Sequence, residues 1–203
     1  MLTQLVALIA PPRCGLCTRA CATSDSLCKR CESLLSARPP RAAPIASLDA
    51  AWSASTYEGV ARDLVVALKF GARLGLASRA ATAIAERAPP ALLDGAIVPV
   101  PASPERRRWR GFDTAEEIAL ALSTRTGLTV DRCLRRTQGR RQVGRPRAER
   151  LEQPPEVRVA AKPPKRAILV DDVVTTGATL GACARALRAG GSERVVALTF
   201  ART

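Results

Sequence analysis

One segment of the chain combines two adjacent carboxylates with a loop rich in hydrogen-bond donors. Asp171 and Asp172 end an apolar run, and Thr-Thr-Gly-Ala-Thr follows at 175–179. Threonine hydroxyls and the free backbone N–H groups at the start of a helix bind anions, and Gly177 lets the backbone approach an anion closely. Carboxylates accept hydrogen bonds from a sugar diol. The residues expected to hold a phosphate are Thr175, Thr176, Gly177, Ala178 and Thr179. The segment predicts a ribose 5-phosphate site with both acids on the ribose hydroxyls, whereas a plain helix cap would explain only the threonines.

Cysteines near the N-terminus form a second pattern with chemical meaning. Two Cys-x-x-Cys pairs, Cys14 with Cys17 and Cys28 with Cys31, are separated by ten residues. Each pair can supply two thiolates from a tight turn, so the four together predict a tetrahedral structural zinc site. A disulfide pair and a redox-active Cys-x-x-Cys are the alternatives, but a redox motif needs one pair beside a strand. Cys21 is interpreted as a spare residue.

Composition limits the remaining chemistry. The 203-residue chain has no His, which excludes His-based acid–base catalysis and His-ligated metals. Lys and Arg number 32 against 18 Asp and Glu, so the net charge of +14 favours a polyanionic partner, whether nucleic acid or phosphorylated small molecule. Aromatic residues make up 3%, too few for a broad base-stacking platform. No apolar run approaches about 20 residues and no basic region precedes the N-terminal apolar stretch, so we expect a cytoplasmic protein without membrane insertion.

The elements that must position these residues alternate along the chain. Apolar runs predict strands at 51–56, 96–101, 128–134, 166–170 and 195–200. Helical spacing of apolar residues predicts helices at 58–70, 74–87 and 113–126, and another after the loop at 175–179. Continuous apolar strands separated by helices indicate an α/β fold, mostly parallel, with helices on both faces of the sheet. A proline-rich stretch places a boundary near residue 40, so we expect a zinc-binding segment and linker at 1–40 and an α/β domain at 41–203.

The segment at 167–179 resembles the phosphoribosyl pyrophosphate signature of type I phosphoribosyltransferases. It has four apolar residues, two acids, two apolar residues and then Thr-Thr-Gly-x-Thr. A Cys-rich segment followed by such a domain resembles the ComF/GntX family. Leu68-Lys69-Phe70, Pro99-Val-Pro101 and Arg110-Gly-Phe112 resemble further blocks of that family. The resemblance covers most of the chain and implies a type I phosphoribosyltransferase fold.

The resemblance also implies roles for two arginine-rich loops. The loop at 101–112, which contains Arg106, would hold pyrophosphate. The stretch at 135–150, which contains Arg135 and Arg141, would close over the substrate. For any one of these arginines, the alternative is a solvated basic surface.

Catalysis, as the resemblance implies it, would rest on Asp171, Asp172 and Arg110, and Arg110 would also bind substrate. Mg²⁺ would bridge the pyrophosphate and the ribose hydroxyls. The transition state should resemble an oxocarbenium ion, so the arginines would stabilise the leaving group by their charge. No general base for an acceptor is visible in the sequence.

The chain departs from the family pattern at one block. Asp113 and Thr114 stand where the family usually has Asn-Gln, and the chain has no Asn at all. This departure concerns the base or acceptor side of the site more than the ribose phosphate side. Lys69 is either a further cation near the site or a partner of the helix dipole, and the second interpretation is preferred. Trp109 and Phe112 could stack on a base, but the preferred interpretation is that they anchor the loop.

Two functions follow. The first is transfer of ribose 5-phosphate from phosphoribosyl pyrophosphate to an unknown acceptor. The second, implied by the association of ComF-like proteins with competence and DNA uptake, is a non-catalytic accessory protein. In that role it would bind a nucleotide or phosphoribosyl ligand together with single-stranded DNA, and would contact a DNA-translocating helicase. The intact signature favours the first, and the altered Asp113-Thr114 block favours the second.

Overall fold

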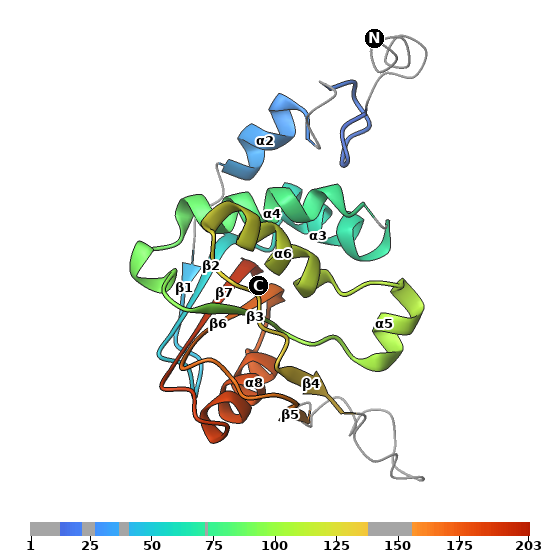
Figure 1. Ribbon diagram of the computed structural model, residues 1–203. Coiled ribbons are helices and arrows are strands. Elements are labelled where there is room, and N and C mark those ends of the chain that lie inside the picture. Colours follow the sequence, from blue (N-terminus) through green and yellow to red (C-terminus); the bar gives the residue numbers. More distant parts are fainter. Residues whose placement is uncertain (1–12, 22–26, 37–40, 72, 138–155) are drawn as a thin grey trace.

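The sheet at the centre of the molecule is mostly parallel. The computed structural model describes residues 13–21, 27–36, 41–71, 73–137 and 156–203. Within these ranges the strand order is β1-β2-β7-β6-β3, and β1 alone runs antiparallel to its neighbour. The strands are β1 (Arg41–Ala42), β2 (Ala50–Thr56), β3 (Ala96–Pro99), β6 (Arg166–Val174) and β7 (Arg194–Arg202). The predicted mixed α/β fold with a mostly parallel sheet is confirmed (Figure 1).

The two longest strands lie side by side in the middle of the sheet. β6 and β7 pair from Arg166 opposite Arg194 to Val174 opposite Arg202. Their apolar residues are almost fully buried because helices cover both faces, which is why these strands read as continuous apolar runs. The strand predicted at 166–170 continues to Val174. The two acids that were expected at the end of a strand therefore lie inside one.

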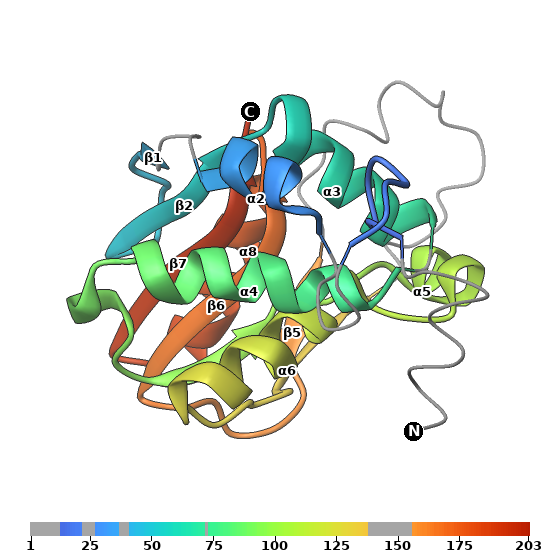
Figure 2. The same cartoon turned by 90° about the horizontal axis from the view of Figure 1, so that it is seen from above.

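Helices form a layer on each side of the sheet (Figures 1 and 2). One layer consists of α3 (Gly59–Phe70), α4 (Gly75–Arg87) and α6 (Thr114–Thr126), and the other of α8 (Ala178–Ala189). Leu64, Ile84 and Leu122 bring the first layer onto one core cluster, and Leu180 and Leu187 bring α8 onto a second. Apolar residues at helical spacing thus fill the space on either side of β6 and β7.

A short helix occupies part of the loop that follows β3. Residues 101–112 were expected to be a loop, but α5 (Pro104–Arg110) lies within them. The Oγ of Ser103 accepts a hydrogen bond from the backbone N–H of Arg106, and proline stands at the first position of the helix, as is common at helix starts. Gly111 ends the helix in the left-handed conformation, with φ of 79°. The arginines of this loop are therefore carried on a helix.

The strand predicted at 128–134 is largely absent. Val130 forms a single parallel bridge with Ile97 of β3. The strand itself begins later, as β4 (Leu134–Arg136), and pairs antiparallel with β5 (Val157–Val159) in a separate small sheet. Residues 138–155, which include Arg141 and most of the predicted closing loop, lie outside the described residues.

The cysteine-rich segment packs on the outer side of the helices α3 and α4 (Figure 2). It contains α2 (Lys29–Ser36), whose Leu35 is buried. Glu32 forms an ion pair with Arg79 of α4. Arg87 donates hydrogen bonds to the carbonyl oxygens of Ser36 at 2.6 Å and of Ala54 in β2 at 2.9 Å. The segment thus contacts the α/β core, while the predicted division at residue 40 stays a prediction.

In the part of the chain that the structure describes, no helix is both long enough and apolar enough to cross a membrane.

Candidate functional site

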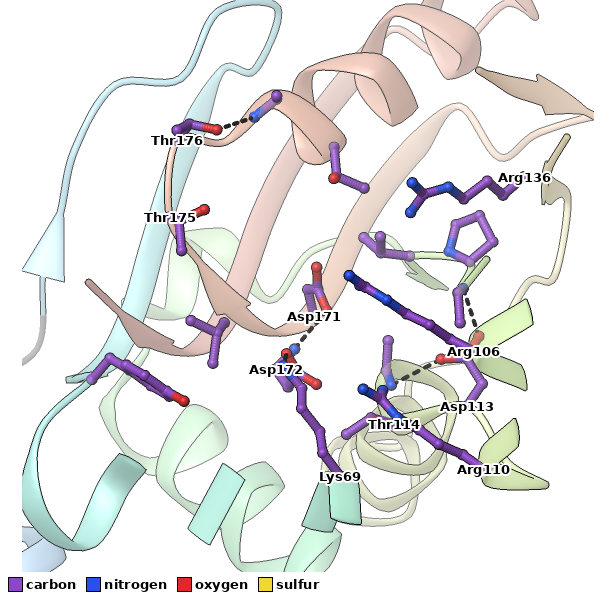
Figure 3. A pocket seen from close by; sticks show the side chains of 18 of the residues that line it. Lys69, Arg106, Arg110, Asp113, Thr114, Arg136, Asp171, Asp172, Thr175 and Thr176 are labelled. Carbon is purple, nitrogen blue, oxygen red and sulfur yellow. Dashed lines mark hydrogen bonds and ion pairs between the residues drawn. The ribbon is translucent and has the colours of Figure 1, made fainter. Parts of the chain in front are cut away.

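A cavity of about 750 Å³ lies at the carboxyl edge of β3 and β6 (Figure 3). In an open parallel sheet, ligands bind beyond the carboxyl ends of the strands. The cavity brings together three acids and four cations from five segments of the chain. These charged residues are Asp113, Asp171, Asp172, Lys69, Arg106, Arg110 and Arg136.

The two acids of β6 have different surroundings. Asp172 is 5% exposed, and its Oδ1 lies 2.7 Å from the Nζ of Lys69. The Oδ1 of Asp171 accepts a hydrogen bond of 2.8 Å from the backbone N–H of Asp172. Burial raises the pKa of Asp171 well above its usual value, and the neighbouring Asp172 carboxylate raises it further. In the ligand-free protein an uncompensated negative charge on Asp171 is therefore unfavourable.

The predicted phosphate loop borders the same cavity. Thr175, Thr176, Ala178 and Thr179 line it. The Oγ1 of Thr176 accepts a hydrogen bond of 3.3 Å from the backbone N–H of Ala178, which caps the first turn of α8. This loop and the start of α8 carry hydroxyls and N–H groups of the kind that bind anions.

Gly177 lines a small cavity formed by the same loop, which shares Thr175, Thr176 and Thr179 with the main cavity. Its φ is 78°, and a Cβ there would lie 2.9 Å from the Cδ1 of Ile45. Glycine at this position serves the backbone turn and the packing of Ile45, and the expected close approach of the backbone to an anion stays a prediction.

Arginines from two elements form the opposite wall of the cavity. Arg106 and Arg110 come from α5, and Arg136 comes from β4. Burial lowers the pKa of Arg136, and the nearby positive charge of Arg106 lowers it further. Crowded cations of this kind are stabilised when an anion lies between them.

Arg135, which the sequence favoured, does not line this cavity. It borders an adjoining cavity of about 220 Å³ and donates hydrogen bonds to the carbonyl oxygens of Arg132 and Leu134. Arg136, the next residue of the strand, lines the main cavity and also borders the adjoining one. Alternation along the strand could have identified Arg136 had the position of β4 been known.

The start of α6 contributes the block that departs from the family pattern. Asp113 caps the helix, and burial raises the pKa of its carboxyl. Thr114 is 3% exposed. Among the described residues, the buried Oγ1 of Thr114 and the buried Nε of Arg110 have no hydrogen-bond partner. A buried polar atom without a partner is unfavourable, so these two atoms leave a local cost in the ligand-free protein.

Aromatic side chains of α3 and α5 meet near the cavity. Phe70 and Trp109 form an edge-to-face pair with ring centroids 5.8 Å apart. The guanidinium carbon of Arg110 lies 5.4 Å from the Phe70 centroid, within cation–π range. Trp109 is 70% exposed, and its ring contacts that of Phe70. The rest of its surface is accessible.

The four cysteines of the two Cys-x-x-Cys pairs come together. Their sulfur atoms all lie within 4.8 Å of one another, and Cys17 Sγ is 3.5 Å from Cys28 Sγ. Four thiolates at about 2.3 Å from one zinc ion stand about 3.8 Å apart, so the cluster fits structural zinc. The described cysteines form no disulfide, and Cys21 is not part of the cluster.

Backbone N–H groups surround Cys14 in this cluster. Burial acts to raise the pKa of its thiol, but hydrogen bonds from backbone groups of Cys17 and Leu16 outweigh burial and lower the pKa to about 6. This environment favours the thiolate, which is the form that binds metal.

The fold and the cavity define an α/β protein with a cavity lined by acidic and basic residues at the carboxyl edge of its sheet. No protein-family model matches the chain. Competence protein ComFC of Streptococcus pneumoniae (strain ATCC BAA-255 / R6) is 31% identical over 108 residues, which cover 52% of this chain and 47% of ComFC. The chain is therefore aligned with about half the length of this curated relative. This match confirms the resemblance to ComF proteins that the sequence motifs indicated.

Among solved structures, similarity was found to glutamine phosphoribosylpyrophosphate amidotransferase from B. subtilis complexed with ADP and GMP. The TM-score is 0.42 at 17% identity, covering 60% of this chain and 25% of that one.

Proposed function

We propose that the cavity binds a 5-phosphoribosyl ligand, either phosphoribosyl pyrophosphate or a nucleotide. The observation that carries this proposal is the placement of Asp171, the loop at 175–179 and three arginines around one cavity. The ribose hydroxyls would lie on the acid side, the 5′-phosphate at the loop and the start of α8, and the pyrophosphate against Arg106, Arg110 and Arg136.

The proposed reaction is transfer of ribose 5-phosphate to an acceptor. The bond between C1′ and the pyrophosphate oxygen breaks, pyrophosphate leaves with the electron pair, and a bond forms from the acceptor to C1′. The acceptor's proton passes to water. Arg110 would touch the leaving group, and the arginines together would stabilise its growing charge. Positioning supplies the rest of the rate enhancement, in keeping with a chain that has no His.

Mg²⁺ fits this arrangement, since it is usually held by one or two carboxylates together with substrate phosphates. Asp171 is a carboxylate on the cavity wall, and the proposed ligand would bring the phosphates. When bound, Mg²⁺ would neutralise part of the pyrophosphate charge.

Calorimetry with phosphoribosyl pyrophosphate and Mg²⁺ tests binding. The wild-type protein should bind, and Asp171→Asn with Asp172→Asn should abolish binding. Unchanged affinity in this double variant would refute the ribose assignment. Release of pyrophosphate, measured over a panel of nucleobases and amines, then tests catalysis.

A second candidate function is that of a non-catalytic accessory protein contacting single-stranded DNA and a helicase. The exposed ring of Trp109 favours it, because this ring lies on a helix with four arginines and one acid, Glu105. Stacking of a base on an aromatic ring and charge attraction to phosphates are the usual contributions to single-strand binding. Fluorescence anisotropy of a labelled oligonucleotide, with Trp109→Ala for comparison, tests this candidate. If none of the nucleobases and amines in the panel gives release of pyrophosphate, the accessory function becomes the favoured one.

A further inference from the structure

The last turn of α3 brings a lysine to the cavity from a segment far away in sequence from the two acids. Lys69 is 23% exposed at its side chain and lines the cavity. The neighbouring residues Leu64, Val65 and Leu68 are fully buried, so this end of the helix is held against the core. A lysine in the last turn of a helix is favoured by the helix dipole, which explains its presence but not its direction.

The direction of Lys69 is set by Asp172. The distance from Nζ to Oδ1 is 2.7 Å, and the Asp172 side chain is 7% exposed. If the ammonium group moved away, the Asp172 carboxylate would be left nearly buried without a compensating charge. This cost favours the observed position of Lys69. Figure 3 shows Lys69 reaching up to Asp172 from below, while Asp171 points the other way, toward the arginines.

The two acids of β6 therefore differ in the oxygens that they offer to a ligand. One oxygen of Asp172 is engaged by Lys69. An ammonium group has three N–H donors, and in the described part of the chain Asp172 is its sole partner. The remaining N–H groups of Lys69 border a cavity in which the proposed ligand carries hydroxyl and phosphate oxygens.

We propose that Lys69 is a ligand-binding residue, that Asp172 is a positioning residue which acts through it, and that Asp171 is the acid that receives the ribose diol. This inference rests on the proposed function. It differs from an equal division of the ribose hydroxyls between the two acids. It also assigns Lys69 a direct contact with the ligand beyond its favourable position in the helix.

A double-mutant cycle tests the coupling between the two residues. Calorimetric affinity for phosphoribosyl pyrophosphate with Mg²⁺ is measured for wild type, Lys69→Met, Asp172→Asn and the double variant. We expect Lys69→Met to weaken binding at least about tenfold, the scale of one charge-assisted hydrogen bond. The double variant should bind no more weakly than Lys69→Met, because Asp172 acts through Lys69. Additive losses would overturn the proposal, since they mean that Asp172 contacts the ligand independently.

Three further variants separate binding from folding. Lys69→Arg should recover most of the affinity because it restores a cation at the same place. Lys165→Met is the matched control: its ion pair with Glu193 is exposed and remote from the cavity, so affinity should not change. Asp171→Asn should lose more affinity than Asp172→Asn. Circular dichroism and thermal unfolding verify that each variant is folded. The double variant of Lys69→Met and Asp172→Asn has the further advantage that it leaves no buried charge unpaired.

The outcomes distinguish this inference from the function on which it rests. If the wild-type protein binds neither phosphoribosyl pyrophosphate nor AMP, the proposed function and this inference both fail. If the wild type binds and Lys69→Met binds equally well, only the role of Lys69 is refuted.

Discussion

The carboxylate of Asp113 joins two parts of the cavity wall. Its Oδ2 accepts a hydrogen bond of 2.8 Å from the backbone N–H of Ala102, and its Oδ1 accepts one of 3.1 Å from that of Ala115. Both oxygens act as acceptors, which an Asn side chain with its single oxygen cannot reproduce. The aspartate that departs from the family pattern therefore ties the loop after β3 to the first turn of α6.

Replacing this aspartate by asparagine should weaken that link. We expect Asp113→Asn to lower the free energy of unfolding by about 1–3 kcal/mol, because one buried backbone N–H loses its acceptor. Urea unfolding measures the change. Asp94→Asn, at an exposed ion pair with Arg166, is the control and should change stability little. Equal stability of Asp113→Asn and wild type would mean that the two hydrogen bonds contribute nothing.

Neighbouring arginines of β4 should differ in their effect on binding. Arg136→Met should weaken affinity for phosphoribosyl pyrophosphate about tenfold or more, because Arg136 faces the main cavity. Arg135→Met should stay within about twofold, because Arg135 lies outside it. Calorimetry of the two variants side by side gives the comparison. A larger loss for Arg135→Met than for Arg136→Met would contradict the placement of the ligand in the main cavity.

Gly177→Ala should destabilise the protein by about 1–3 kcal/mol. Alanine is strained at a φ of 78°, and its Cβ would collide with Ile45. Thermal unfolding measures the loss. Combining the substitution with Ile45→Ala removes the collision but not the backbone strain, so the pair should be less than additive. Gly191 also has a positive φ, but a Cβ there would meet no atom within 4 Å. Gly191→Ala therefore measures the cost of backbone strain without a collision. If Gly177→Ala is as stable as wild type, the turn tolerates a side chain.

Stability of the ligand-free protein should fall as the pH rises, through Asp171. Burial and then the neighbouring Asp172 raise its pKa, so the folded state keeps a proton that the unfolded chain releases above about pH 4. The free energy of unfolding decreases over this range up to the folded pKa. Asp171→Asn should remove that loss and make the ligand-free protein more stable than the wild type at pH 8. Urea unfolding from pH 4 to 8 tests this, and a parallel profile for wild type and variant would contradict it.

Metal analysis should find about one zinc ion per chain in the wild-type protein. The double variant with Cys14→Ser and Cys28→Ser should contain no zinc. Because the cysteine-rich segment packs on α3 and α4, metal loss should also lower the midpoint of thermal unfolding. Cys21→Ser is the matched control, since Cys21 lies outside the four-sulfur cluster, and it should keep its zinc. A metal-free wild-type protein that is fully folded would rule out the structural zinc site.

The parts of the molecule that could be predicted from sequence are those fixed by local pattern. Apolar runs located β6 and β7, and helical spacing located α3, α4 and α6, because each buries a regular apolar face. The spacing of Cys14, Cys17, Cys28 and Cys31 similarly implied that four sulfurs would meet, as they do.

Contacts between distant segments could not be predicted in this way. The pairing of Lys69 with Asp172 depends on how α3 crosses the end of β6, which no local pattern records. Which of Arg135 and Arg136 lines the main cavity depends on the direction in which each side chain of β4 points. The sequence could not show this direction because the predicted boundaries of β4 were wrong. The exposure of Trp109 likewise follows from the helix that replaced a predicted loop.

The continuation of β6 past its apolar run has a consequence for the thermodynamics of recognition. Asp171 is held by strand pairing opposite Thr199, whereas the cations opposite come from α5 and β4 by long, flexible side chains. A ligand would therefore meet one preorganised wall and one that must be ordered. The entropy lost on binding would fall mainly on the arginines, each immobilised side chain costing about 0.5–1.5 kcal/mol. Ligands that share the sugar phosphate and differ in the group at C1′ should consequently differ most in their binding entropy.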